Sequence, residues 1–227
     1  MPWRELANDY SIVNALREKA PDGYGLGSNA KLLTADDDLN TVLTTGWYNW
    51  SWAAHPQNAP DNNWREYGCA MHVFSTTPGG YTIQTVYDLS DDITHGCAIQ
   101  RTIYVISSGN VYYPWEWVNP PMQLGVEYRT TERYLGYPVY VKLINLGSLP
   151  NAGSTKQISV RDLGIRVPIS MDLTWGNFAS ENFTVNDYAP YVASAGFDNA
   201  NINIVGGPSA DTEHYEVYAF LKYSKSN

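Results

Sequence analysis

The stretch Tyr215-Glu-Val-Tyr-Ala-Phe-Leu-Lys-Tyr223 shows the class of fold most clearly. Its large apolar residues recur every second position, which is the period of a β-strand. One face would carry Tyr215, Val217, Ala219, Leu221 and Tyr223. The other face would carry Tyr218 and Phe220, so we predict a strand buried on both sides, within a sandwich or between subunits.

The composition of the whole chain agrees with a mainly β fold. The 227 residues include 18 Gly and 13 Pro, 14% are aromatic and only 16% are charged, whereas charged residues make up about 25% of an average globular protein. Such an aromatic content excludes global disorder. The net charge of −9, without any cluster of Lys and Arg, argues against a nucleic-acid partner.

Membrane insertion is not expected either. No apolar run approaches the ~20 residues that span a bilayer, and the first residues carry no apolar signal segment.

Short strands separated by turns are predicted along most of the chain. Before residue 119 the expected strands are Ala70 to Phe74, Tyr81 to Tyr87 and Cys97 to Ile106, after an opening with Trp47, Tyr48, Trp50 and Trp52. After it they are Val126 to Arg133, Pro138 to Leu146, Lys156 to Val160, Gly164 to Pro168, Phe183 to Val185, Tyr191 to Ala195 and Ile202 to Val205. Leu135-Gly136-Tyr137 reads as the turn of a hairpin.

Helical patterns are confined to the first part of the chain. An apolar stripe at helical spacing consists of Leu6, Tyr10, Val13, Leu16 and Ala20, and Pro21 ends it. A helix this short is marginal alone in water, so it needs a partner, either the rest of the chain or copies of itself. Asp36, Asp37 and Asp38 would fit the acidic first turn of a second short helix within residues 31–45.

The clearest linker is Asn119-Pro120-Pro121, because two prolines cannot donate to a β-ladder. We therefore expect an N-terminal helix and linker in residues 1–30, a small β module in residues 31–119 and a C-terminal antiparallel β-sandwich-like domain in residues 120–227.

Catalytic and metal-binding patterns are missing from the sequence. There is no Gly-x-Ser-x-Gly elbow, and Gly23, Gly25 and Gly27 lack the strand and helix of a phosphate loop. The histidines His55, His72, His95 and His214 lack zinc-site spacing. Cys69 and Cys97 either stay unpaired and buried or pair across strands. We expect no cofactor, no metal and no catalytic residue, although carboxylates that a glycosidase would need are present at Asp88, Asp91, Asp92, Glu116, Asp172 and Glu181.

The order of aromatic motifs in residues 31–146 resembles a known family. Thr45-Gly-Trp-Tyr-Asn-Trp50 opens the pattern, Asn58-Ala-Pro and Gln84-Thr-Val-Tyr come next, and Trp115-Glu-Trp117 closes it. This is similar to the pyocin-knob module in tail fibres of bacteriophages and phage-tail-like bacteriocins. Trp117 follows Trp115 by only two positions, which places both indoles on one side of a regular strand. We expect Trp47, Tyr48, Trp115 and Trp117 to pack in the core.

The resemblance implies the distal, receptor-binding piece of a tail fibre, usually a homotrimer. Its partners would be a glycan or protein on the bacterial surface, copies of itself, and other tail proteins through the N-terminus. It would be assembled in the host cytoplasm, belong to the virion tail and act outside the cell without enzymatic activity. Two alternatives remain: a structural or trimerising spacer, and a tailspike-type glycan depolymerase, although no repeat of 20–30 residues suggests a β-helix.

The predicted ligand site is the polar loop from His55 to Trp64, which is rich in Asn and Pro, together with residues beside it. Aromatic rings stack on sugar C–H groups, and amides or carboxylates bind hydroxyls. The candidates that supply this mixture are Trp52, Asn58, Asn62, Asn63, Trp64, Glu66 and Tyr81. The alternative is that the tryptophans only anchor this loop to the module.

Overall fold

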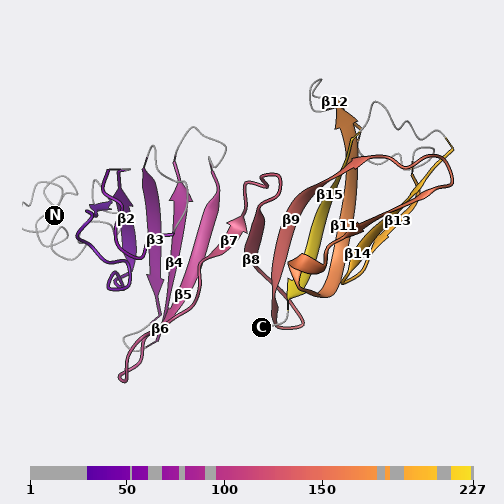
Figure 1. Cartoon of the computed structure of the whole chain (residues 1–227). Helices are drawn as coiled ribbons and strands as arrows, with labels where there is room; N and C mark the ends of the chain where they lie inside the picture. The colour runs from indigo at the N-terminus through magenta and orange to yellow at the C-terminus, as the bar shows by residue number, and fades with distance from the viewer. Residues whose placement is uncertain are drawn as a thin grey trace, which may run out of the picture. The chain divides into compact units, whose positions relative to one another are not determined.

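The computed structural model describes residues 30–51, 53–60, 68–76, 80–89, 96–177, 182–184, 192–208 and 216–225. The chain divides into two compact units, Met1–Pro121 and Met122–Asn227. In the described residues the regular structure is β, apart from the single 3-10 turn η1 at Arg161–Leu163 (Figure 1). The prediction of a mainly β chain is confirmed, whereas the predicted N-terminal helix lies outside the described residues.

The first unit contains one mixed sheet in the order β1-β2-β3-β4-β5-β7, with the short β6 paired to β5. β1 runs parallel to β2, and the other pairs in this unit are antiparallel. The strands are β1 (Lys31–Leu32), β2 (Gly46–Trp50), β3 (Cys69–Ser75), β4 (Tyr81–Asp88), β5 (Ala98–Tyr104), β6 (Val111–Tyr112) and β7 (Glu116–Asn119).

One side of this sheet, which we call the covered face, forms the core of the first unit. Strict alternation along the strands sends to it Tyr48, Trp50, Cys69, Met71, Val73, Val86 and Ile99, and Leu33 and Leu39 close over them. Trp115 and Trp117 both pack against this cluster. The expectation that the two indoles share one side and pack there is confirmed.

The predicted second short helix, within residues 31–45, is wrong. The segment forms successive turns, because the acids bind nearby backbone groups instead of starting a helix. The Asp37 carboxylate accepts hydrogen bonds from Thr34 N at 2.7 Å and Thr34 Oγ1 at 2.9 Å, which also lowers the pKa of Asp37. Asp38 Oδ1 accepts one from Asn40 N at 2.8 Å.

The second unit has two antiparallel sheets. The larger has the order β8-β9-β15-β11-β12 and the smaller β10-β14-β13. The strands are β8 (Glu127–Tyr134), β9 (Tyr137–Ser148), β10 (Thr155–Ser159), β11 (Ile165–Asn177), β12 (Asn182–Thr184), β13 (Val192–Phe197), β14 (Asn201–Gly206) and β15 (Glu216–Lys225). One hydrophobic cluster draws residues from both sheets.

Strand β15 lies between β9 and β11 in the larger sheet, and the prediction for this strand is confirmed. The residues that point into the shared cluster are each 0% exposed: Val217, Ala219, Leu221 and Tyr223. On the other face Tyr218 is buried and Phe220 is half-buried. Tyr215 lies outside the described residues.

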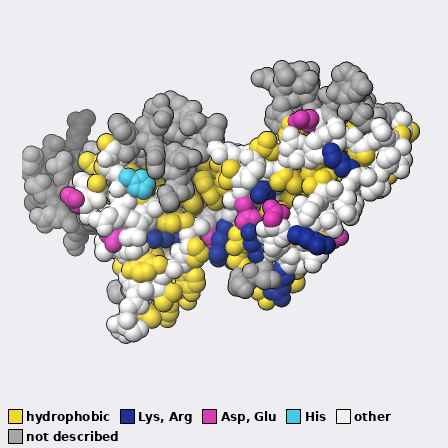
Figure 2. Space-filling model, in the orientation of Figure 1, with side chains coloured by type: hydrophobic (Ala, Val, Ile, Leu, Met, Phe, Trp, Pro, Cys, Tyr) yellow, Lys and Arg dark blue, Asp and Glu magenta, His cyan; other side chains and the backbone are white. Residues whose placement is uncertain are grey.

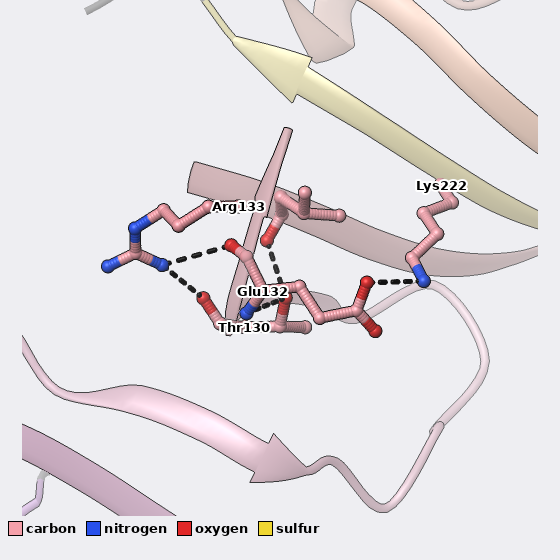
Figure 3. A network of polar contacts seen from close by, with 5 residues as sticks. Thr130, Glu132, Arg133 and Lys222 are labelled. Atoms are coloured by element: carbon pink, nitrogen blue, oxygen red, sulfur yellow. Dashed lines mark hydrogen bonds and ion pairs between the residues drawn. The ribbon is translucent and has the colours of Figure 1, made fainter. Parts of the chain in front are cut away.

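Several strand pairs of the larger sheet contain register shifts. β11 continues beyond Pro168, where the sequence predicted its end, because a register shift between Pro168 and Ser170 accommodates the proline. β8 has a register shift between Arg129 and Arg133. There Thr130 Oγ1 donates to Val139 O at 2.9 Å and accepts from Glu132 N at 3.3 Å, which holds the irregular segment (Figure 3).

The hairpin between β8 and β9 has the predicted turn. Leu135 and Gly136 have φ angles of 50° and 82°, and Tyr134 pairs with Tyr137. Positive φ at both central residues is the requirement of a type I′ hairpin turn. The described residues include no helix that could span a membrane.

Candidate functional site

The side of the first sheet opposite the core, here called the open face, gathers aromatic and neutral polar side chains. Strands β2 to β5 contribute Trp47, Asn49, Ala70, His72, Phe74, Tyr81, Ile83, Thr85, Tyr87, Gln100, Thr102 and Tyr104. None of these is Lys, Arg, Asp or Glu; the neighbouring β7 places Glu116 opposite Gln100. An array of rings and neutral hydrogen-bonding groups on one side of a sheet suits recognition of a neutral, polyhydroxylated or peptide surface.

Trp47 corrects one sequence expectation. Its indole is 41% exposed, so it does not pack in the core as expected, whereas its neighbour Tyr48 is buried. Adjacent residues of a strand point to opposite faces, so the two aromatic residues of the Trp47-Tyr48 pair cannot both enter one core.

Rings on the open face form two clusters. In the first, the Trp47 ring centroid lies 4.8 Å from that of His72 and 6.1 Å from that of Tyr87. In the second, Tyr81 and Tyr104 stack with centroids 4.7 Å apart. These cross-strand contacts fix the rings in place while leaving Tyr81 49% exposed. We call them the Trp47 cluster and the Tyr104 cluster.

Residues 111–113, which we call the arm, are hydrophobic and adjoin the Tyr104 cluster. Tyr104 pairs with Val111 of β6, and Val111, Tyr112 and Tyr113 are each more than two-fifths exposed. Figure 2 shows hydrophobic side chains gathered on this arm, at the bottom of the first unit where Figure 1 places β6.

Within the described residues, most polar side-chain atoms of the open face make no hydrogen bond. Thr85 Oγ1 donates to Gln100 Oε1 at 3.3 Å. Among the described residues, no hydrogen-bond partner meets the Gln100 amide nitrogen or the hydroxyls of Tyr81, Tyr87 and Tyr104. A ligand on this face would find these donors unpaired within the described structure.

On the covered face, by contrast, the polar side chains of Arg101 and Gln84 form a hydrogen-bonded network. Arg101 is 6% exposed, its Nε donates to Gln84 Oε1 at 2.8 Å, and its guanidinium lies 4.5 Å from the Trp115 ring centroid. Gln84 Nε2 in turn donates to Leu39 O at 2.7 Å and Val42 O at 2.8 Å. Burial lowers the pKa of Arg101 to about 10, a shift that Asp38 opposes. This network ties the loop before β2 to the sheet.

Of the predicted ligand residues, the structure describes Asn58 and Tyr81. Asn58, at φ 58°, donates from Nδ2 to Asp38 Oδ1 at 2.7 Å, and its carbonyl accepts from Trp115 Nε1 at 3.3 Å. These contacts tie Asn58 to the covered side of the sheet, whereas Tyr81 lies on the open face, so the structure does not bring the two together. The other predicted residues lie outside the described part of the chain: Trp52, Asn62, Asn63, Trp64 and Glu66.

Two of the described carboxylates, Asp88 and Glu116, lie on opposite sides of the first sheet. Asp88 pairs with Cys69 on the covered face, whereas Glu116 pairs with Gln100 on the open face. Asp172 belongs to the second unit, and Asp91, Asp92 and Glu181 lie outside the described residues. No cluster of three His, Cys, Asp or Glu side chains able to hold a metal occurs among the residues that are described.

The two cysteines are buried and unpaired. Strand β4 separates them, since Cys69 pairs with Asp88 and Asp88 N donates to Cys97 O at 3.1 Å. Burial, with a contribution from the Asp88 carboxylate, raises the pKa of Cys69 to about 12 and also raises that of Cys97. Thiols with raised pKa are poor nucleophiles.

Of the open-face residues, the sequence-based prediction of the ligand site includes only Tyr81, because that prediction concerns mainly a polar loop. The signal was present in the alternation of β3 and β4, where His72, Phe74, Tyr81, Thr85 and Tyr87 occupy the positions between core residues. The expected function of a strand residue depends on whether another layer covers its face, and alternation alone does not show this.

The chain has similarity to solved structures but no match by sequence. No protein-family model and no curated sequence match the chain. Among solved structures it is similar to an N-truncated R2-type pyocin tail fibre, with 10% identity and a TM-score of 0.30 over 86% of this chain and 98% of the other. It is also similar to a C-terminal portion of the Pseudomonas aeruginosa R1 pyocin fibre, with 10% identity and a TM-score of 0.31 over 86% of this chain and 68% of the other.

Proposed function

We propose that the chain is a distal receptor-binding module of a phage tail fibre, which recognises a glycan or protein on the bacterial surface without enzymatic activity. The observation that supports this most directly is the open face, with exposed rings that contact one another and neutral donors that have no partner in the described structure. The ordered motifs from Thr45 to Trp117 support the assignment to a tail fibre. In this proposal the protein belongs to the virion tail and joins other tail proteins through its N-terminus.

The domain assignment forms part of the proposal. Residues 31–119 would be the pyocin-knob-like module that presents the open face, and residues 120–227 a sandwich-like distal domain. The second unit supports this reading through its two sheets and the hydrophobic cluster they share.

Adsorption of the purified protein to a panel of bacterial cells tests the proposal. Trp47→Ala and Tyr81→Ala should abolish most adsorption with little change in thermal stability, because both side chains are more than two-fifths exposed. Tyr134→Ala, at a tyrosine in the second unit that is 38% exposed, is the matched control. Unchanged adsorption of both open-face variants would contradict the assignment.

The loop residues predicted from sequence form a second arm of this experiment. Loss of adsorption in Trp52→Ala and Trp64→Ala, at unchanged melting temperature, would move the site to the loop of Asn58, Asn62, Asn63 and Glu66. A spacer function, the main alternative, predicts that no variant of either set affects adsorption. A reducing-end assay on the same glycans tests the depolymerase alternative.

We also propose a homotrimer with its N-terminal segments at the axis. The apolar stripe that includes Val13 and Leu16 is too short to persist as an isolated helix. Replacing both residues with Asp should weaken assembly, and a monomeric mass by light scattering for the unmodified chain would refute the proposal.

A further inference from the structure

Resting on the proposed function, we infer that the open face binds an uncharged glycan chain that spans the Trp47 cluster and the Tyr104 cluster at the same time. The ligand would be a multi-sugar segment laid across the sheet. A single terminal sugar and an acidic polymer are both excluded by this inference.

The two ring clusters are far enough apart to require a chain. His72 of the Trp47 cluster pairs with Thr85 on β4, and Tyr81 of the Tyr104 cluster lies four residues from Thr85 on that strand. At a rise of about 3.3 Å per residue, the two rows are about 13 Å apart. One sugar ring cannot contact both rows, whereas consecutive sugars of a chain can.

Each cluster offers a ring surface for the C–H faces of sugars. Trp47 is 41% and Tyr81 49% exposed, and Phe74, on the row between them, is 50% exposed. Stacking against these rings buries apolar surface and adds an orientation-dependent attraction. The neighbouring rings His72, Tyr87 and Tyr104 hold the exposed rings in a fixed orientation, so little conformational entropy is lost on binding.

Neutral hydrogen-bonding groups lie beside the rings and between the two clusters. Thr85 and Gln100 lie on the same row as His72, and Thr102 lies on the next row towards Tyr104. Within the described part of the chain, the Gln100 amide nitrogen and the Thr102 hydroxyl make no side-chain hydrogen bond. A hydroxyl-bearing chain can occupy these groups, and a ligand that lacks hydroxyls would leave them unpaired.

The charge distribution favours an uncharged ligand. Strands β2 to β5 direct no Lys or Arg to the open face, so the carboxylates or phosphates of an acidic glycan would find no partner there. The net charge of −9 over the whole chain also disfavours an anion.

The test measures binding of the full chain to an array of purified bacterial surface polysaccharides, some neutral and some containing uronic acid or phosphate. We expect retention of neutral chains and, in a length series of a retained chain, a drop in affinity of at least about tenfold once the oligosaccharide is too short to reach both clusters. Trp47→Ala and Tyr104→Ala should each weaken long-chain binding about 5–50-fold. Tyr134→Ala in the second unit should have no effect.

Three results would overturn the inference. These are preferred binding of acidic glycans, equal affinity for single sugars and long chains, and an unchanged glycan affinity in both cluster variants. A change of oligomeric mass in the same variants would instead identify the open face as an interface between copies of the chain. If Trp47→Ala and Tyr81→Ala nevertheless abolish adsorption to cells, the receptor-binding function stands with a different ligand.

Discussion

Tyrosines of the open face and tyrosines of strand β15 differ in whether their hydroxyls have a partner within the protein. On the open face of the first unit, Tyr81 and Tyr104 stack on each other, and in the described residues their hydroxyls have no protein partner. In the second unit Tyr223 is fully buried and donates to Glu127, and Tyr218 donates to Glu216 Oε2 at 2.5 Å. Figure 2 shows charged side chains of both signs side by side on the second unit, whereas the arm of the first unit carries none in this view.

This difference shows how one residue type serves two purposes. A buried hydroxyl needs a partner, so the second unit supplies carboxylates and becomes self-contained. Glu127, for example, also accepts from Lys225 Nζ at 2.6 Å. An exposed hydroxyl is satisfied by water, which a ligand can replace. The open face therefore keeps donors for the proposed ligand, whereas Tyr218 and Tyr223 use theirs within the fold.

The largest expected effect tests whether the two units are stable separately. Leu221→Ala removes a fully buried side chain from the central strand of the second unit, and such substitutions cost about 2–5 kcal/mol. We expect the second unit to melt earlier while near-UV signals of the first unit persist. Joint melting of both units would show that they unfold as one.

Alkaline pH should weaken the first unit through its buried thiols. The pKa of Cys69 rises from 9.0 to about 12 on folding, so its contribution is fully present below pH 9 and is lost as the pH rises towards 12. The free energy of unfolding should fall by up to ~1.4 kcal/mol per pH unit in this window. Cys69→Ala should flatten the slope measured by urea unfolding, and an unchanged slope would contradict burial of this thiol.

A matched pair of Tyr→Phe variants tests the comparison directly. Tyr223→Phe removes the hydroxyl that donates to the half-buried Glu127 carboxylate and should cost about 1.5–3 kcal/mol, the range for hydrogen bonds to charged groups. Tyr104→Phe removes a hydroxyl that has no partner in the described structure, so its stability should change by less than ~0.5 kcal/mol. Equal losses in thermal unfolding of the two variants would remove the distinction between the units.

Asn58 separates a structural role from a binding role within the first unit. Asn58→Ala loses the hydrogen bond to Asp38 and places an alanine at φ 58°, which together should cost about 1–2 kcal/mol. Asn58→Gly tolerates this φ and should cost less. Both variants should adsorb to cells normally once folded. Reduced adsorption of the glycine variant at unchanged melting temperature would make Asn58 a ligand residue.

The smallest effect is expected at the surface of the second unit. Lys222 Nζ lies 2.5 Å from Glu132 Oε2, and the Glu132 side chain is 56% exposed (Figure 3). Exposed ion pairs contribute about 0–1 kcal/mol and are screened by salt. Lys222→Met should therefore lower the free energy of unfolding by less than ~1 kcal/mol, and a larger loss that survives high salt would show that the pair is effectively buried.

Several features can be predicted from the sequence alone because they depend on local periodicity or turn chemistry. The alternation in Val217, Ala219, Leu221 and Tyr223 predicts a buried strand, and the structure places it at the centre of a sheet. The hairpin at Leu135 and Gly136 depends on a glycine that accepts positive φ. The spacing of Trp115 and Trp117 predicts that both rings pack on one side.

Other features depend on contacts between distant segments, and only the tertiary structure decides them. Trp47 has the same local pattern as its buried neighbour Tyr48, and it is exposed because the described structure places the core cluster on the other side of the sheet. Asp37 forms a turn in place of a helix because residues 37–39 also exchange backbone hydrogen bonds with Gln57. Arg101 is buried because the loop ending at Val42 and the ring of Trp115 close around it. A sequence gives each strand two faces, but burial of one face depends on which distant residues cover it.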